Sequence, residues 1–359
     1  MGKFSTALKA VLAAQLLPRM VQGAADGGGP AATLHYRPLN GDNLREMARR
    51  KMHHGADTYL NPMGIPRDKR FWQVLSWKLF HKNAYAGFLD DQPIVPVSID
   101  WNSVKAHRGV SVTFIKHLIL LIKDKDRILL IDPVFDNIFW FIKDFTPRDF
   151  NLDDMPYPDH VLITHGHYDH LDHQSLAALD PGTHVISPLG YDHEFKTLGI
   201  THRTQLPWSA RSSDGQREIT LLPANHWTMR NPIIGPNRSL WGGYLIKTAG
   251  GPVIYISGDS AYFDGFEQLA DEYDIDLAIF NLGAYAPRWF MAPSHMNPAE
   301  TVQAFQEIKA RHLMIAHWGT FQLGDEPVHF PPGDLTNALK DQGLFSRWIN
   351  LDHGQTHFF

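Results

Sequence analysis

The stretch Thr164-His165-Gly166-His167-Tyr168-Asp169-His170-Leu171-Asp172 directly follows the apolar run 161–163. Imidazole and carboxylate groups are the ligands that zinc and similar divalent metals prefer. A strand that ends in such a cluster presents these ligands on a loop at the edge of a sheet, where a metal and a substrate can both reach them. The alternative interpretation is a solvated histidine-rich loop or an adventitious metal site.

Three further apolar runs, which we expect to be strands, lead to a residue that can bind a metal. They are 219–222 before His226, 253–256 before Asp259, and 313–316 before His317. A single histidine at a strand end would carry little weight. Four such strand ends predict one shared site, provided that the strands run parallel and that their ends are neighbours.

Seven ligands exceed the roughly four that one zinc ion takes, so the sequence predicts two zinc ions per chain. We assign the ligands as follows: His165, His167 and His226 to the first metal, Asp169, His170 and His317 to the second, and Asp259 as the bridge. A carboxylate can bridge because it has two oxygens. Metals about 3.5–4 Å apart can also share a hydroxide, whose parent water has its pKa lowered to about 7. This hydroxide would be the nucleophile, so no serine or cysteine nucleophile is required.

Composition bounds the class of protein. The 359 residues are 43% hydrophobic and 20% charged, which is enough for a substantial core in one large domain or two moderate ones. The net charge of -5 argues against a nucleic-acid partner. The sequence has no cysteine, which rules out disulfides and thiolate ligands within it, whereas its 21 histidines suit a His/Asp metal site.

We divide the chain into a tail (1–30), an irregular lead-in (31–100) and a main domain (101–359). The tail ends in Gly27-Gly28-Gly29-Pro30, which is typical of a flexible linker. Its apolar part is consistent with a weak secretory signal or with an amphipathic helix that lies on a membrane. No run reaches the ~18–20 apolar residues that span a bilayer. The lead-in contains an aromatic stretch, 71–80, with the spacing of a helix.

The main domain alternates expected strands and helices, which predicts a mixed α/β fold with at least two sheets. Besides the four strands above, we expect strands at 110–116, 118–122, 127–131, 184–187, 243–247 and 277–281. We expect helices at 172–179, 190–198, 263–272, 298–309 and 334–342. The helix at 298 has Asn297 as its N-cap, Pro298 at its first position and Glu300 for a capping box.

The metal motif, with its distant histidine, Gly-Asp and late histidine, resembles the metallo-β-lactamase superfamily. Three further blocks resemble its N-acylphosphatidylethanolamine-hydrolysing phospholipase D branch: Asn225-His226-Trp227, the run Gly-Ala-Tyr-Ala-Pro-Arg-Trp-Phe-Met at 283–291, and Ala-His-Trp-Gly-Thr-Phe at 316–321. The resemblance covers roughly residues 95–357. It implies a four-layer αβ/βα sandwich with a di-zinc site at the sheet edges. It also implies a zinc-dependent phosphodiesterase that converts N-acylphosphatidylethanolamine into N-acylethanolamine and phosphatidic acid.

The resemblance also implies roles for residues outside the ligand set. His295 matches a histidine near the metals and the head group, which could orient a phosphate oxygen or protonate the leaving alcohol. We therefore place His295 with Asp169 and Asp259 in the catalytic set; the alternative is a histidine in the loop before a helix. Tyr168 could donate to the substrate or could simply be packed. Asp132 matches a buried aspartate that supports the ligands, and His353, closing the final strand, is expected to be supportive too.

The sequence departs from the branch in two places. The strand end that usually reads Gly-His-Ala is Lys116-His117-Leu118 here, which keeps only the histidine. After Pro133, where relatives carry a basic and glycine-rich loop, residues 135–145 are apolar on nearly every face. This stretch is either a buried helix or a lipid-facing lid or acyl-chain groove, since an exposed apolar patch marks an interaction site.

A lactonase or another ester or phosphodiester hydrolase is the alternative function, because a fold does not determine its substrate. An iron-based oxygen reductase would carry a carboxylate where His167 stands. A nuclease would have a basic surface, and a binding protein without activity would have lost ligands. We expect a phospholipid substrate, peripheral membrane contact on the cytoplasmic side with export as the alternative, and no nucleic acid. The sequence leaves open whether the protein is a homodimer.

Overall fold

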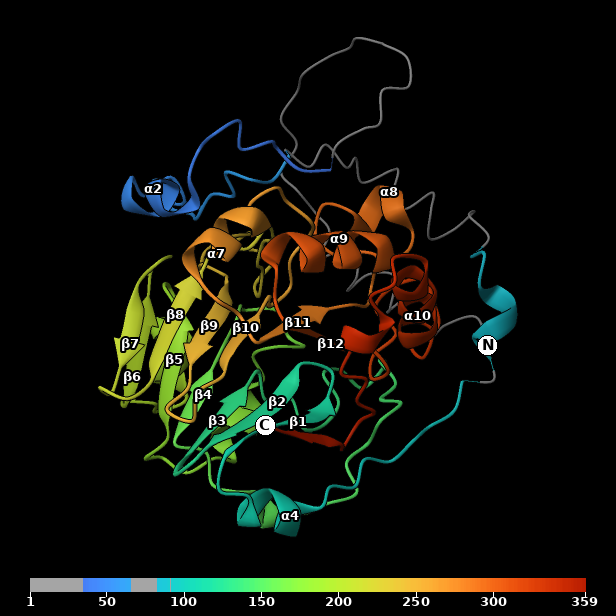
Figure 1. Ribbon diagram of the computed structural model, residues 1–359. Coiled ribbons are helices and arrows are strands. Elements are labelled where there is room, and N and C mark those ends of the chain that lie inside the picture. The colour runs from blue at the N-terminus through green and yellow to red at the C-terminus, as the bar shows by residue number, and fades with distance from the viewer. Residues whose placement is uncertain (1–34, 66–82, 91) are drawn as a thin grey trace.

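Two β-sheets face each other in this computed structural model, which describes residues 35–65, 83–90 and 92–359 (Figure 1). The tail predicted at 1–30 and the helix predicted at 71–80 lie outside the described residues. None of the helices in the described part of the chain is long and apolar enough to cross a bilayer.

The first sheet has seven strands in the order β13-β1-β2-β3-β4-β5-β6. Their bounds are β1 (Val110–Lys116), β2 (Ile119–Asp124), β3 (Arg127–Ile131), β4 (His160–Leu162), β5 (His184–Pro188), β6 (Arg203–Leu206) and β13 (Thr356–Phe358). Strands β3 to β6 are parallel, and β13, β1, β2 and β3 pair antiparallel. The parallel half therefore has one common edge at which all four strands end.

The second sheet has six strands in the order β12-β11-β10-β9-β8-β7. Their bounds are β7 (Arg211–Ser213), β8 (Glu218–Leu222), β9 (Gly243–Lys247), β10 (Val253–Ile256), β11 (Leu277–Asn281) and β12 (His312–Ala316). Strands β10, β11 and β12 are parallel, and β7 to β10 pair antiparallel. Because β9 alone separates β8 from β10, these two strands run in the same direction.

Strand β3 shows why both faces of the first sheet are buried. Leu129 and Ile131 belong to the core cluster shared with the second sheet, whereas Ile128 and Leu130 belong to a second cluster on the opposite face. Successive strand side chains point to opposite faces, so an apolar run without alternation requires a layer on each side. The sequence of β3 thus places it in the interior of a layered fold.

Helices form the two outer layers. The second cluster includes side chains from α4 (Trp101–Ala106), α5 (His173–Ala177) and α6 (Asp192–Thr197), which cover the first sheet. Side chains of α7 (Phe266–Glu272), α9 (Pro298–Ile308) and α10 (Pro331–Asp341) join the cluster of the second sheet. In Figure 1, α4 lies at the bottom and α7 and α9 toward the top, with the strands between them. The predicted four-layer αβ/βα sandwich is therefore confirmed.

The remaining elements are short. They are α2 (Leu44–Arg49), α8 (Arg288–Met291) and the 3₁₀ turns η1 (Ala86–Phe88), η2 (Leu152–Asp154) and η3 (Phe345–Arg347). Helix α2 lies in the predicted lead-in and packs on the main domain, because its first backbone N–H donates to Gln268 of α7 and Met47 joins the shared core. Helix α9 begins with the expected capping box of Asn297 and Glu300.

Two local details differ from expectation. Of the two alternatives for residues 135–145, the buried helix was wrong: Phe135 and Phe145 are buried without forming a helix, while Trp140 between them is 74% exposed. His353 lies in the turn that precedes β13 rather than in the strand, and its Nε2 is 3.0 Å from the carbonyl oxygen of Trp318. Strands β6 and β7 were not expected, because their sequences are mostly polar; Leu206 at the end of β6 is buried, and the other residues are half-buried or exposed.

Candidate metal centre

The seven predicted ligands lie on loops at the carboxyl ends of four strands. The loop after β4 carries four of them, and the loops after β8, β10 and β12 carry His226, Asp259 and His317. The predicted convergence of these strand ends is confirmed, although β4 belongs to the first sheet and the other three strands to the second. Packing of the two sheets brings the ends together: the N–H of Gly242 donates to the carbonyl of Thr164 across the interface.

Gly258, just before Asp259, shows how closely the two sheets approach. Its φ is 58°, a left-handed value that glycine adopts without strain. A Cβ atom there would lie 2.7 Å from the carbonyl oxygen of Gly242 and 3.2 Å from the side chain of Thr164. A larger residue would therefore push the Asp259 loop away from the histidine motif.

The first cluster contains His165, His167, His226 and Asp259. Nδ1 of His167 is 2.9 Å from Nε2 of His165 and 3.4 Å from Nε2 of His226. Oδ2 of Asp259 is 3.7 Å from each of those two Nε2 atoms. The four donor atoms therefore surround one point.

The second cluster contains Asp169, His170 and His317, and a ring nitrogen of His117 lies close enough to all three to be a further candidate ligand. Oδ2 of Asp169 is 3.4 Å from Nε2 of His170 and 3.5 Å from Nε2 of His317, and these two nitrogens are 3.2 Å apart. Asp259 reaches this cluster as well, with Oδ2 3.4 Å from His170 and Oδ1 3.3 Å from His317. Asp259 thus contacts ligands of both clusters.

These spacings fit two tetrahedral metals. Bonds of about 2.0–2.1 Å from a tetrahedral zinc place its donor atoms about 3.4 Å apart. Most of the donor distances in both clusters lie within a few tenths of an ångström of that value. The residues present can therefore hold two divalent ions, with Asp259 shared between them.

Hydrogen bonds at the far ring nitrogens orient the histidines. Nδ1 of His170 is 2.8 Å from Asp132, which also accepts from the backbone and hydroxyl of Thr164. Nδ1 of His226 is 3.1 Å from the carbonyl of Ser294. A proton on Nδ1 leaves Nε2 free to bind a metal. Asp132 thus occupies the supporting position that was predicted for it.

Burial and neighbouring charges set the protonation of the site. Burial alone would raise the pKa of the Asp259 carboxyl, but the His317 and His170 imidazoles outweigh it and hold the pKa well below its ordinary value. The pKa of Asp169 is lowered in the same way, by His170 and His117 against burial. Burial lowers the pKa of His165 well below its usual range. The site therefore holds ionised carboxylates and a neutral His165, the forms that bind metals.

His295 and Tyr168 both border the clusters. The His295 ring lies 5.4 Å from that of His226 and 5.7 Å from that of His317, and its Nδ1 is 4.0 Å from Asp259. The Tyr168 hydroxyl donates to the carbonyl of Arg230 at 2.6 Å, while the Arg230 guanidinium lies 4.5 Å above its ring. Donation by Tyr168 to a substrate, which remains a prediction, would replace this bond.

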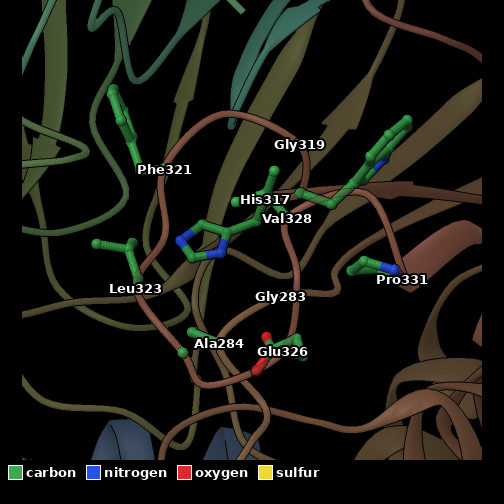
Figure 2. Close-up of a pocket in the computed structure, with 11 residues that line it drawn as sticks. Gly283, Ala284, His317, Gly319, Phe321, Leu323, Glu326, Val328 and Pro331 are labelled. Atoms are coloured by element: carbon green, nitrogen blue, oxygen red, sulfur yellow. The ribbon is translucent and has the colours of Figure 1, made fainter. Parts of the chain in front are cut away.

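Sequence reasoning missed three residues that contact the ligands or line the same region. His117 contacts Asp169, and Asn281 at the end of β11 donates to Asp259 at 2.6 Å. Figure 2 shows the third, Glu326, which lines a small pocket together with His317. The backbone N–H groups of Tyr285 and Ala286 donate to the Glu326 carboxyl, and burial raises its pKa to about 7. The retained histidine in Lys116-His117-Leu118 was the one signal available for these positions.

Comparisons with known proteins agree with this geometry. Residues 127–318 match the family model described as the Beta-lactamase superfamily domain. The chain is 27% identical over 326 residues to N-acyl-phosphatidylethanolamine-hydrolyzing phospholipase D 1 of Caenorhabditis elegans, covering 85% of this chain and 91% of that protein. It is 28% identical to the mitochondrial N-acyl-phosphatidylethanolamine-hydrolyzing phospholipase D of Saccharomyces cerevisiae, covering 64% of this chain and 52% of that protein.

Two further matches extend the comparison. A UPF0173 metal-dependent hydrolase of Pyrobaculum calidifontis is 28% identical over 218 residues, which cover 60% of this chain and 86% of that protein. Among solved structures, the fold is similar to an isothiocyanate hydrolase from Delia radicum gut bacteria, with a TM-score of 0.59 and 16% identity over 69% of this chain and 98% of that chain. The similarity to the isothiocyanate hydrolase concerns the fold alone, because the sequence identity is low.

Proposed function

Because this chain belongs to the beta-lactamase superfamily and is a metal-dependent hydrolase, we propose that it cleaves the phosphodiester of N-acylphosphatidylethanolamine. The products would be N-acylethanolamine and phosphatidic acid, and the metals two zinc ions. The observation that carries the proposal is the pair of donor clusters that share Asp259. The relatives in Caenorhabditis elegans and Saccharomyces cerevisiae support the choice of substrate by their names.

The residues around the clusters suit a phosphodiester. Two divalent ions in such a site supply an acidified water and positive charge for the phosphoryl oxygens. Asp259 would hold both ions, and His295, whose ring lies near a ligand of each cluster, would hydrogen-bond a phosphoryl oxygen. A tetrahedral phosphorus group has enough oxygens to meet the two clusters and His295 at once. A planar lactone group offers the same groups only its carbonyl oxygen and its ring oxygen.

Two loops next to Tyr168 suit a lipid substrate. We call residues 138–142 the aromatic segment: its Phe139 ring contacts Tyr168 at 4.9 Å and stacks on Phe141 at 5.2 Å, while Trp140 is 74% exposed. The loop that carries Arg230, which also contacts Tyr168, exposes Ile233 by 93%. Exposed apolar side chains this close to a site mark an interaction surface. We propose that they contact acyl chains at a membrane surface.

A buried ion pair holds the aromatic segment in place. The ammonium of Lys116 donates to the carbonyl of Phe135 at 3.0 Å and to Asp144 at 2.5 Å, and the Lys116 side chain is fully buried. These two contacts lie just before and just after the segment, so one side chain fixes both of its ends. Trp140 is therefore presented from an anchored base, which lowers the conformational entropy that lipid binding would cost.

The test combines metal analysis with identification of products. We expect two zinc ions per chain and, by mass spectrometry, release of N-acylethanolamine and phosphatidic acid from N-acylphosphatidylethanolamine vesicles. A matched N-acyl lactone serves as the competing substrate. Two zinc ions with hydrolysis of the lactone alone would refute the proposed substrate and favour the lactonase alternative. Absence of bound metal from the folded, zinc-supplemented protein would refute the site itself.

A further inference from the structure

His117 lies at the end of β1, beside the second cluster but outside the predicted ligand set. The residue is 1% exposed and has a φ of 50°, a left-handed value that a side chain of this size rarely adopts. The backbone N–H of His117 donates to the hydroxyl of Thr320 at 2.9 Å. Such a backbone persists where the surroundings hold it in place, and it is a reason to look for a functional role.

The His117 residue contacts two ligands of the second cluster. Its Nε2 is 3.1 Å from Oδ2 of Asp169. Its ring packs on that of His317 with 4.0 Å between centroids and 39° between planes. Its backbone carbonyl accepts from the N–H of His317 at 2.7 Å. Asp169 and His317 come from different sheets, so His117 connects ligands that would otherwise be positioned independently.

Geometry favours a supporting role for His117 over a role as a ligand. Asp169, His170, His317 and Asp259 already supply the four donors that a tetrahedral metal takes. The Nε2 of His117 stands at hydrogen-bond distance from a carboxylate oxygen that itself faces the other donors. An N–H on Nε2 would donate to Asp169.

The histidine ligands differ in how they are supported. Among the described residues, His165, His170 and His226 have hydrogen-bond partners at Nδ1, in Thr164, Asp132 and Ser294. The Nδ1 of His317 is buried without such a partner, and a Cβ on Gly283 would lie 3.3 Å from it. His317 is therefore held by ring packing and by its backbone bond to His117.

We propose that His117 is a positioning residue for the second metal, donating its Nε2–H to Asp169 and bracing the ring of His317. This inference rests on the proposed pair of metals but not on the lipid substrate. Partners behind metal ligands commonly contribute about 10–100-fold to metal affinity. Loss of His117 should therefore weaken binding of the second metal. Binding of the first metal should stay essentially unchanged, because the His117 side chain hydrogen-bonds Asp169 of the second cluster.

The test compares His117→Gln with His117→Leu by cobalt(II) titration of the metal-free protein. Gln places an amide N–H near the position of Nε2, whereas Leu removes the donor. Both variants have a side chain at a residue with left-handed backbone, so this backbone affects them alike. We expect Leu to weaken the second binding step about 10–100-fold with the first unchanged, and Gln to stay within a few-fold of the parent chain. The absorption spectrum of bound cobalt should keep its intensity in the Gln variant, because the coordination number is unaltered.

Two outcomes would overturn the proposal. Equal affinity of the parent chain and the Leu variant for both ions would show that His117 positions nothing. A Gln variant that weakens the second step as much as Leu, with a changed cobalt spectrum, would identify His117 as a ligand. Thermal melts of the metal-free variants control for folding. If Leu does not fold, His117→Ala, which also removes the donor, takes its place in the comparison with Gln: a weakened second step supports positioning, and an unchanged one contradicts it. Neither readout uses lipid turnover. Failure of the proposed substrate can therefore be told apart from failure of the role proposed for His117.

Discussion

Replacing Trp140 by serine tests whether the aromatic segment meets lipid. The Trp140 side chain is 74% exposed, so of the roughly 250 Å² that a tryptophan can bury about 180 Å² faces solvent. If half of this area enters the apolar part of a bilayer, about 90 Å² at about 25 cal/mol per Å² gives about 2 kcal/mol. We therefore expect Trp140→Ser to weaken partitioning into vesicles by roughly 30–50-fold.

Tyr157→Ser is the matched control. Tyr157 is 52% exposed and comes just before β4, whereas the metal ligands follow that strand, so it lies at the opposite end of the sheet. The Tyr157→Ser substitution should therefore leave vesicle binding unchanged. Co-sedimentation with phosphatidylcholine vesicles measures both variants, and zinc content and melting temperature should equal those of the parent chain, since an exposed side chain contributes little to stability.

Kinetics separate a contact with the membrane from a contact with the reacting group. Trp140→Ser should raise the apparent KM for vesicle substrate and leave kcat, and turnover of a short-chain soluble analogue, close to the parent values. Equal vesicle binding by the Trp140 variant and the parent chain would refute the reasoning. So would an equal loss in the Tyr157 variant, because binding would then not depend on this face.

Three further predictions concern the site, the anchor and acid stability. Asp259→Asn should abolish turnover and lower zinc content while leaving the melting temperature of the metal-free protein near that of the parent chain, because it removes the negative charge that contacts both clusters; near-normal activity would mean that the ligand assignment is wrong. Lys116→Met should cost about 3–5 kcal/mol in urea denaturation, because it leaves the nearly buried Asp144 unpaired, and the double variant with Asp144→Leu should recover part of this loss; no recovery would contradict the pairing. Burial lowers the pKa of His53 to about 4, below its ordinary value of 6.5, so the unfolded chain binds the extra proton and stability falls as pH drops from about 6.5 toward 4. His53→Phe should reduce this fall by about 1–2 kcal/mol. Urea denaturation of both proteins at pH 7 and pH 5 measures it; an equal loss of unfolding free energy in the two proteins between these pH values would contradict the reasoning.

The ligand motif could be predicted from the sequence because its information is local. His165, His167, Asp169 and His170 occupy one loop, and the apolar run before them is a strand in any context that buries both of its faces. The capping box of Asn297 and Glu300 is similarly complete within one turn. The same reason made three other strand ends recognisable, those that lead to His226, Asp259 and His317. Each can be identified from a short apolar run and the few residues that follow it.

Contacts between distant segments required the tertiary structure. Nothing in the sequence places Lys116 against Asp144, and residues 135–145 were expected to be either a buried helix or a lipid-facing segment. The ion pair and the buried Phe135 hold this stretch in an irregular path, which overrides its apolar composition. The placement of Trp140 in solvent is a consequence of that path.

The sequence by itself determined the ligand types, their loops and the mixed α/β class, because these follow from metal chemistry and from the spacing of apolar residues in short segments. The layered arrangement was implied by the family resemblance. The tertiary structure decided that the four ligand-bearing strands belong to two sheets, that Asp259 contacts both clusters, and that His117 stands behind Asp169. Residues 117 and 169 are brought together by sheet pairing from β1 through β4 and by the packing of one sheet on the other. Register and packing angle are properties of whole layers, and a local pattern of side chains does not contain them.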